Sequence, residues 1–124
     1  MESKEFRKGN IVYNSKLDIL KKGYIEIEAR YIYEIAVKES GQGYRDYVDY
    51  FEYVPLTKNW LKRFGFKKGS DFIGNYYLLK DPQFCIYYDN DCFTYIDGGI
   101  EVKYLHQFQN LFFALRNEEL ILKH

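Results

Sequence analysis

The chain has 124 residues, of which 47% are hydrophobic and 20% aromatic, which is enough to bury a core and excludes a disordered chain. Its 18 Lys+Arg and 18 Asp+Glu residues give a formal net charge of +0. This balance excludes a general attraction to nucleic acid or to an anionic membrane, although a local patch could still provide one. No apolar run approaches the roughly 18 to 20 residues of a membrane helix, and the start of the chain lacks a signal-peptide pattern. We therefore expect one domain over residues 1–124, cytoplasmic and without a membrane partner.

The first part of the chain has the pattern of strands. A Gly9-Asn10 turn precedes a short strand at residues 11–13. Apolar residues then occupy every second position of residues 25–37, as in a half-buried sheet, and the length of this run predicts a bend or bulge near residues 30–32. A helix over residues 28–38 is the alternative, because Glu, Ala and Lys are good helix formers. The alternating positions are Ile25, Ile27, Ala29, Tyr31, Tyr33, Ile35 and Val37.

Residues 44–53 form what we call the tyrosine–acid segment, in which a tyrosine recurs at every third position. Its tyrosines are Tyr44, Tyr47, Tyr50 and Tyr53, and the acids between them are Asp46, Asp49 and Glu52. A short helix would gather four residues on one side: Tyr44, Tyr47, Val48 and Phe51. An extended edge segment is the open alternative.

The clearest local element is a helix over residues 57–64. Thr57 is suited to the N-cap, and Leu56 with Leu61 forms a hydrophobic staple across it. Gly65 ends the helix, and Phe66 can fold back on Leu61 in a Schellman-type cap. The buried face consists of Trp60, Leu61 and Phe64.

The last part of the chain predicts an antiparallel meander followed by a helix. Strands are expected at residues 72–80, 83–88, 92–96 and 100–102, separated by turns at Asp81-Pro82, residues 89–91 and Gly98-Gly99. A helix over residues 103–116 follows, with Asn117 as a left-handed cap and residues 118–122 as a tail or short strand. Its apolar stripe is Tyr104, Leu105, Phe108, Leu111, Phe112 and Leu115. We expect an α+β fold: a curved antiparallel sheet, made of the N-terminal strands and the meander, packed by two helices.

Two surfaces are candidates for contact with a partner protein. Exposed tyrosines bind at low entropic cost, and carboxylates between them can engage a basic groove. On the tyrosine–acid segment the candidates are Tyr44, Asp46, Tyr47, Asp49 and Tyr50, and on the polar face of the last helix they are His106, Gln109 and Phe113. Half-buried tyrosines on a solvated edge, and a histidine that bonds to a neighbouring loop, are the structural alternatives.

Signals of other functions are weaker. His106 could serve as a general base, but the spacing supplies no nucleophile or second titrating group, so we expect no catalytic site. Cys85 and Cys92 would be offset along paired strands, which favours reduced thiols over a disulfide. With His106 they lack the spacing of a zinc site, and we expect neither a metal nor a cofactor.

A nucleic-acid-associated regulator is the alternative function. Phosphate contacts require a basic surface, and five basic positions in and after the residue 57–64 helix could supply one. They are Lys58, Lys62, Arg63, Lys67 and Lys68. The meander is a poorer candidate, because the aspartates that flank its strands would repel phosphate.

The chain resembles a family of short proteins carried by phages and mobile elements of bacteria with AT-rich genomes. Three blocks carry the resemblance: Phe6, Arg7, Lys8, Gly9, Asn10; Pro55, Leu56, Thr57, Trp60, Leu61, Phe64, Gly65, Phe66; and Tyr104, Leu105, His106, Gln107, Phe108, Gln109, Asn110, Leu111, Ala114, Leu115, closed by Glu118, Glu119, Leu120. The family usually has Gly at position 117, and it varies over the tyrosine–acid segment. The resemblance implies a stoichiometric inhibitor of bacterial defence, such as an anti-CRISPR protein, without enzymatic activity. The implied partner is a bacterial protein, such as a CRISPR effector or its guide-RNA complex.

Overall fold

The computed structural model describes residues 1–90, 92–96 and 99–123. The chain forms two compact units, Met1–Val54 and Pro55–His124, and each is described by itself. The predicted α+β class is confirmed. The strands belong to two antiparallel sheets, of three and five strands over the described residues. Each unit has buried apolar residues of its own. The expectation of one domain over residues 1–124 stays a prediction.

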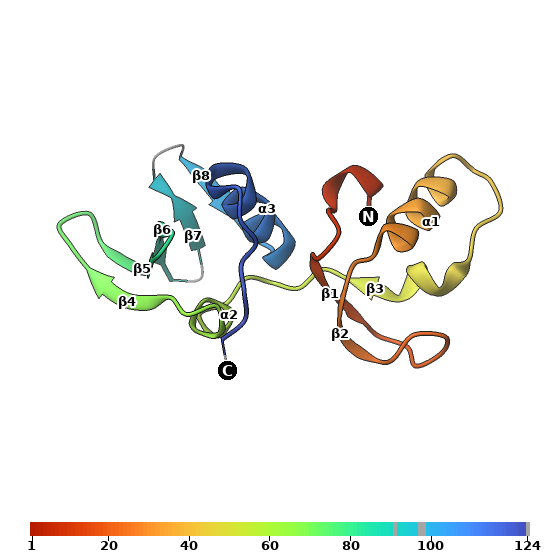
Figure 1. Cartoon of the computed structure of the whole chain (residues 1–124), viewed down its shortest axis with the longest axis horizontal. Coiled ribbons are helices and arrows are strands. Elements are labelled where there is room, and N and C mark those ends of the chain that lie inside the picture. Colours follow the sequence, from red (N-terminus) through yellow and green to blue (C-terminus); the bar gives the residue numbers. More distant parts are fainter. Residues whose placement is uncertain (91, 97–98, 124) are drawn as a thin grey trace. The chain divides into compact units, whose positions relative to one another are not determined.

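The first unit contains a three-stranded sheet in the order β2-β1-β3 (Figure 1). The predicted strand after Gly9 is confirmed as β1, and the left-handed φ of +96° at Gly9 explains the glycine there. The strands are β1 (Ile11–Asn14), β2 (Gly23–Glu26) and β3 (Phe51–Glu52), and the helices are two 3-10 turns, Ser3–Glu5 and Asp46–Tyr50, and α1 (Ala29–Glu39).

The prediction of strand over residues 25–37 is wrong beyond β2, and the alternative helix is confirmed as α1. The sequence fits both a strand and a helix, because Tyr31 and Ile35 are four residues apart. Residues at that spacing lie on the same face of a strand and also on the same face of a helix. In the structure these two residues are buried, whereas Tyr33 between them is 66% exposed. The helix formers Ala, Glu, Arg and Lys in this stretch favour the helical choice.

An aromatic cluster forms the core of the first unit. The Tyr31 ring meets the rings of Tyr47 and Phe51 edge-on, with centroids 5.6 Å away in each case. This geometry suits the quadrupoles of aromatic rings. The cluster therefore ties α1 to the 3-10 turn Asp46–Tyr50 and to β3.

The second unit contains a five-stranded antiparallel meander and two helices (Figure 1). The elements are α2 (Lys58–Arg63), β4 (Lys67–Ser70), β5 (Asn75–Lys80), β6 (Gln83–Asp89), β7 (Cys92–Tyr95), β8 (Ile100–Val102) and α3 (Leu105–Arg116). The meander is confirmed, but the sequence missed β4, whose Lys-Lys-Gly-Ser residues carry no apolar alternation. Phe72 belongs to the turn between β4 and β5 rather than to a strand, and it is 98% exposed.

The caps of α2 are as predicted. The Thr57 hydroxyl accepts a hydrogen bond from the Trp60 N–H, 3.4 Å away. At the other end the N–H groups of Gly65 and Phe66 donate to the carbonyls of Lys62 and Leu61, which is the Schellman arrangement. The predicted face of Trp60, Leu61 and Phe64 is buried.

Helix α3 packs on the sheet through aromatic contacts. The Phe108 ring lies 5.8 Å from the ring of Phe84 on β6, and Phe112 lies 5.2 Å from the same ring. The buried sector also differs from the predicted stripe: Leu111 is half-buried and Leu115 is exposed. The stripe is therefore turned by part of a helical turn toward positions 106 and 109.

The ends and turns of the second unit follow the sequence where they are described. Asn117 adopts the predicted left-handed cap at φ 56° and ψ 31°, and residues 118–123 form a tail. Cys85 and Cys92 are free thiols, as predicted. The expected turns at Asp89–Asp91 and Gly98-Gly99 include Asp91 and Gly98, which lie outside the described residues. No helix in the described parts of the chain is long and apolar enough to cross a membrane.

Candidate protein-interaction surface

The middle of the tyrosine–acid segment is the 3-10 turn Asp46–Tyr50. A 3-10 helix has three residues per turn, which matches the spacing of three between the tyrosines and between the acids. Asp46 and Asp49 are consequently exposed, while Tyr47 and Val48 are buried. The turn thus presents two carboxylates side by side and anchors itself with the residues between them.

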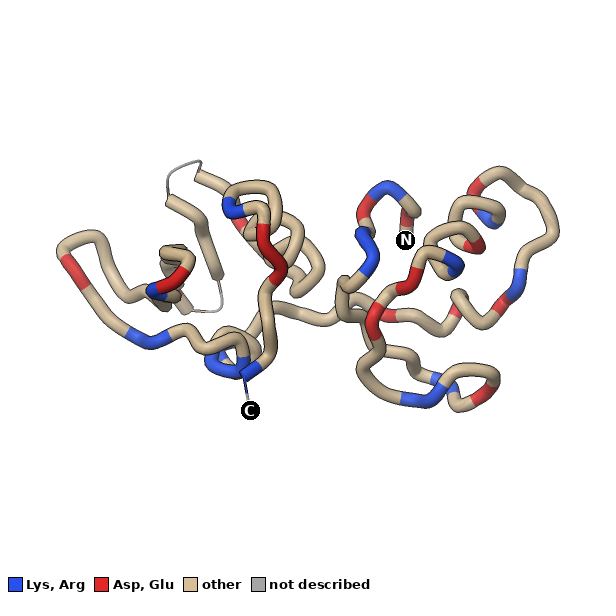
Figure 2. The backbone as a smooth tube through the Cα atoms, in the orientation of Figure 1, with Lys and Arg blue, Asp and Glu red and all other residues tan. Residues whose placement is uncertain are grey.

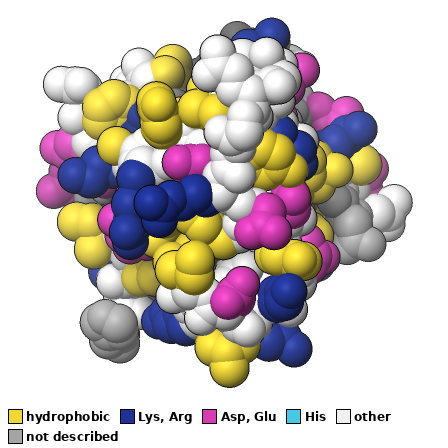
Figure 3. All heavy atoms as spheres, turned by 90° about the vertical axis from the view of Figure 1, so that its right-hand side faces the viewer, with side chains coloured by type: hydrophobic (Ala, Val, Ile, Leu, Met, Phe, Trp, Pro, Cys, Tyr) yellow, Lys and Arg dark blue, Asp and Glu magenta, His cyan; other side chains and the backbone are white. Residues whose placement is uncertain are grey.

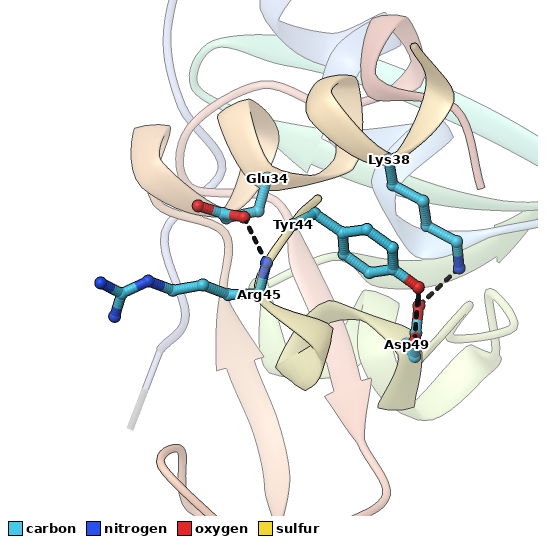
Figure 4. Close-up of polar contacts among 5 residues, drawn as sticks. All are labelled: Glu34, Lys38, Tyr44, Arg45 and Asp49. Carbon is cyan, nitrogen blue, oxygen red and sulfur yellow. Dashed lines mark hydrogen bonds and ion pairs between the residues drawn. The ribbon is translucent and has the colours of Figure 1, made fainter. Parts of the chain in front are cut away.

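Asp49 is held in place by two side chains (Figure 4). Lys38 on α1 places its Nζ 2.5 Å from Oδ1 of Asp49. The Tyr44 hydroxyl donates to the same carboxylate, with oxygen distances of 2.8 and 3.0 Å. The Lys38 ammonium also lies 5.3 Å from the centroid of the Tyr44 ring, within the range of a cation–π contact.

These contacts shift the ionisation of all three groups. The hydrogen bond from Lys38, with a further one from Tyr44, lowers the pKa of Asp49. The hydrogen bond to Asp49 raises the pKa of both Lys38 and Tyr44. Asp49 is therefore charged at neutral pH and remains so on mild acidification.

Two backbone contacts fix the rest of the segment. The Arg45 N–H donates to Oε2 of Glu34 on α1 at 2.7 Å, as Figure 4 shows. The Tyr50 carbonyl accepts from both the N–H and the hydroxyl of Ser15, at 2.9 and 3.0 Å. The segment is thus attached to α1 at its start and to the chain after β1 at its end.

The surface around this segment is mixed in character. On the face that Figure 3 draws, basic, acidic and apolar side chains are interspersed. Asp49 contacts Lys38 and Tyr44, and Asp46 follows the exposed Arg45 in the chain, so the two acids lie beside basic and aromatic groups. Such a surface favours recognition by matching individual charges.

One tyrosine was assigned the wrong role. Tyr47 was expected to contact a partner, but it is 8% exposed and packs against Tyr31 and Phe51. Burial also raises the pKa of its hydroxyl. Tyr44 and Tyr50 are half-buried, so their edges remain available at the surface.

The prediction of an exposed polar face on α3 is wrong for two of its three residues. His106 and Gln109 are 2% and 3% exposed, and only Phe113 is half-buried. The His106 ring stacks on that of Tyr104, with centroids 6.0 Å apart. A partner or substrate could reach His106 only if the helix moved, so this face is a poor contact surface.

The five basic residues proposed for nucleic acid are all exposed, and Figure 2 shows basic positions at α2 and at the start of β4. Two of them contact aromatic rings: Lys58 lies 4.5 Å from the ring centroid of Tyr88, and Arg63 lies 4.3 Å from that of Trp60. Lys67 and Lys68 are successive residues of a strand and point to opposite faces. They cannot both join one flat phosphate site with α2.

Sequence reasoning missed Glu34 and Lys38, the two side chains of α1 that hold the tyrosine–acid segment. Both lie on α1, four residues apart, so one helical face carries both. The alternative helix over residues 28–38 contained this signal. It became visible only when the helix was chosen over the strand.

No group of three or more His, Cys, Asp or Glu side chains among the described residues could hold a metal ion. Comparison of the chain with protein-family models, curated proteins and solved structures found no match.

Proposed function

We propose that this protein is a non-enzymatic binding protein whose partner docks on Asp46, Asp49 and the exposed edges of Tyr44 and Tyr50. The observation that carries the proposal is the fixed geometry around Asp49, which Lys38 and Tyr44 hold in place before any partner arrives. Side chains ordered in advance lose less entropy on binding. A fixed carboxylate with a second exposed acid three residues away, beside aromatic edges, suits a basic groove of the kind that binds nucleic acid.

The proposed partner is a bacterial defence nuclease, such as a CRISPR effector or its guide-RNA complex, in the cytoplasm of a bacterial host. The resemblance to small phage-borne proteins supports this choice, because phage-borne proteins of similar size often act as stoichiometric inhibitors of bacterial defence. The position of the acids in the segment where that family varies is a second support. Specificity for one partner would then reside in the segment rather than in the shared helices.

The experiment measures protection of a phage in bacteria whose CRISPR system targets it. Expression of the protein should restore plating of the phage, and Asp46→Lys should reduce protection. With the purified effector, the same substitution should weaken binding tenfold or more, about 1.4 kcal/mol. Glu26→Lys is the matched control, because Glu26 is an exposed acid on β2 of the same unit. The proposal would be contradicted if the protein protected the phage against none of the CRISPR types tested. It would also be contradicted if Asp46→Lys and Glu26→Lys reduced protection and effector binding equally.

A nucleic-acid-associated regulator is the second candidate. Residues 55–68 contain Lys58, Lys62, Arg63, Lys67 and Lys68 and no Asp or Glu, so this stretch is locally basic within a neutral chain. Binding to generic RNA or DNA through Lys58, Lys62 and Arg63, together with one of the two strand lysines, should fall steeply with salt. Fluorescence anisotropy at two salt concentrations, with Lys62→Gln as the variant, separates this candidate from the first.

A further inference from the structure

The loop between β1 and β2 presents two aliphatic side chains to solvent. Leu17 and Ile19 are 73% and 68% exposed. Leu20, the next residue, packs against the core of the first unit instead. The loop therefore separates its apolar residues into one that anchors it and two that point outward.

The conformation of this loop is fixed by a buried amide. Asn14 is 2% exposed, and its Nδ2 donates to the carbonyls of Lys16 at 2.9 Å, Lys21 at 2.8 Å and Leu20 at 3.4 Å. The Asp18 N–H donates to the Leu20 carbonyl at 3.2 Å. Because these bonds order the loop, Leu17 and Ile19 are held outward before any contact is made.

The charge of the loop is positive. Lys16, Lys21 and Lys22 are exposed, and Asp18 is the one acid among residues 15–22. Figure 2 shows these basic positions on the loop that joins β1 and β2. The Lys16 ammonium lies 4.5 Å from the ring centroid of Tyr50 and donates to its hydroxyl at 3.2 Å.

We propose that this loop binds an anionic lipid surface, with Leu17 and Ile19 inserted among the acyl chains and the lysines at the headgroups. Binding of a protein segment to a membrane surface grows with the apolar area that it buries and with its attraction to anionic lipids, and the loop supplies both contributions. Tyr24 on β2, which leads away from the loop, is 51% exposed. A tyrosine with an apolar body and a polar tip suits the headgroup region.

A lipid surface fits this loop better than a protein pocket does. Protein hot spots are enriched in Trp, Tyr and Arg, whereas leucine is under-represented among them. The lysines have long apolar stems that can lie along the acyl boundary while the ammonium stays in water. The proposal goes beyond the proposed function and uses different residues, so either one can fail alone.

The experiment is flotation of the full chain with vesicles of phosphatidylcholine alone or with 30% phosphatidylglycerol. Binding to the anionic vesicles should be at least tenfold stronger and should weaken with salt. Leu17→Ser combined with Ile19→Ser should lower it tenfold or more, and Lys21→Gln with Lys22→Gln several-fold. Circular dichroism verifies that each variant is folded.

Phe72→Ser is the matched control. Phe72 is 98% exposed at the β4–β5 turn, but its neighbour Asp71 is acidic and accepts hydrogen bonds from the N–H groups of Ile73 and Gly74. Its substitution should change vesicle binding less than twofold. An equal loss in Phe72→Ser would mean general adsorption of apolar groups and would overturn the proposal.

Absence of binding to anionic vesicles, or equal binding to both vesicle types, would also overturn the proposal. So would a protein that binds no vesicles but whose Leu17→Ser and Ile19→Ser variant no longer protects the phage. The last result would assign the loop to a protein partner. Asp46→Lys distinguishes the two proposals, since it should weaken the ability of the protein to protect the phage but should not weaken vesicle binding.

Discussion

The sequence predicted a contact surface on both the tyrosine–acid segment and helix α3, but the predicted polar residues are exposed in the segment and buried in the helix. In the segment the acids Asp46 and Asp49 are exposed and Tyr47 between them is buried. In α3 the polar His106 and Gln109 are buried, whereas Leu115 is exposed. Polarity alone thus gave the right orientation for one element and the wrong one for the other.

The difference lies in what each element packs against. The segment is a single 3-10 turn attached to α1 by side chains, so its outer side remains in solvent. Helix α3 is twelve residues long and lies on an aromatic sheet face through Phe108 and Phe112. A broad sheet face covers more than one stripe of a helix, and polar residues at the margin of the stripe become buried with it.

The largest test of this comparison is Phe108→Ala. Phe108 is fully buried against Phe66 and Phe84, so its truncation should lower the free energy of unfolding by about 3 to 5 kcal/mol. Leu115→Ala is the control at an exposed position and should cost about 0.5 kcal/mol or less. Urea denaturation measures both, and similar losses would mean that the buried sector of α3 is misplaced.

The next test is Tyr47→Ala in the segment. Loss of its contacts with Tyr31 and Phe51 should lower the free energy of unfolding by about 3 kcal/mol. Tyr44→Ala removes a partly exposed ring and should cost less than about 1 kcal/mol. If chemical denaturation showed a larger loss of stability for Tyr44→Ala than for Tyr47→Ala, Tyr47 would belong to the candidate contact surface and Tyr44 to the core.

A smaller effect is expected where α3 ends. Asn117 has a left-handed backbone, and its N–H donates to the Phe113 carbonyl at 2.7 Å. Asn117→Ala should cost about 1 kcal/mol, because a Cβ without a local hydrogen-bonding group is disfavoured there. Asn117→Gly should be neutral or slightly stabilising. Thermal denaturation of the two variants separates this backbone effect from loss of the amide side chain.

The smallest effect is expected for Asp49→Asn, below about 1 kcal/mol at pH 7, since Lys38 and Asp49 are partly solvent-exposed. The folded-state pKa of Asp49 is lowered and that of Lys38 is raised. The ion pair therefore stabilises the fold between the ordinary pKa values of the two groups. That contribution is lost as the pH falls through the lowered pKa of Asp49 or rises through the raised pKa of Lys38.

The check is urea denaturation of Asp49→Asn and the parent protein at pH 7 and at strongly acidic pH. The difference between them should shrink as Asp49 becomes protonated. A difference that stays constant with pH would assign the effect to packing rather than to charge.

Local signals in the sequence determined the elements whose ends carry their own chemistry. Thr57, Gly65 and Phe66 defined α2, Asn117 marked the end of α3, and Gly9 preceded β1, because caps and turns depend on only a few neighbouring residues. Turn residues and alternation likewise defined most of the meander. The acids at every third position also indicated a contact segment, although the sequence left its conformation open.

Only the tertiary structure decided the rest. The alternation at residues 25–37 satisfied both a strand and a helix. The helix is accompanied by packing of Tyr31 against Tyr47 and Phe51, in a core cluster that also contains Ile35. Edge strand β4 is defined by its pairing with β5, since its own residues lack a strand pattern. The burial of Tyr47 depends on Tyr31, a neighbour distant in the chain. The exposure of Leu17 and Ile19 depends on a loop whose shape the Asn14 amide fixes. Hydrophobicity reports what a side chain prefers, but the surrounding fold determines whether there is room to bury it.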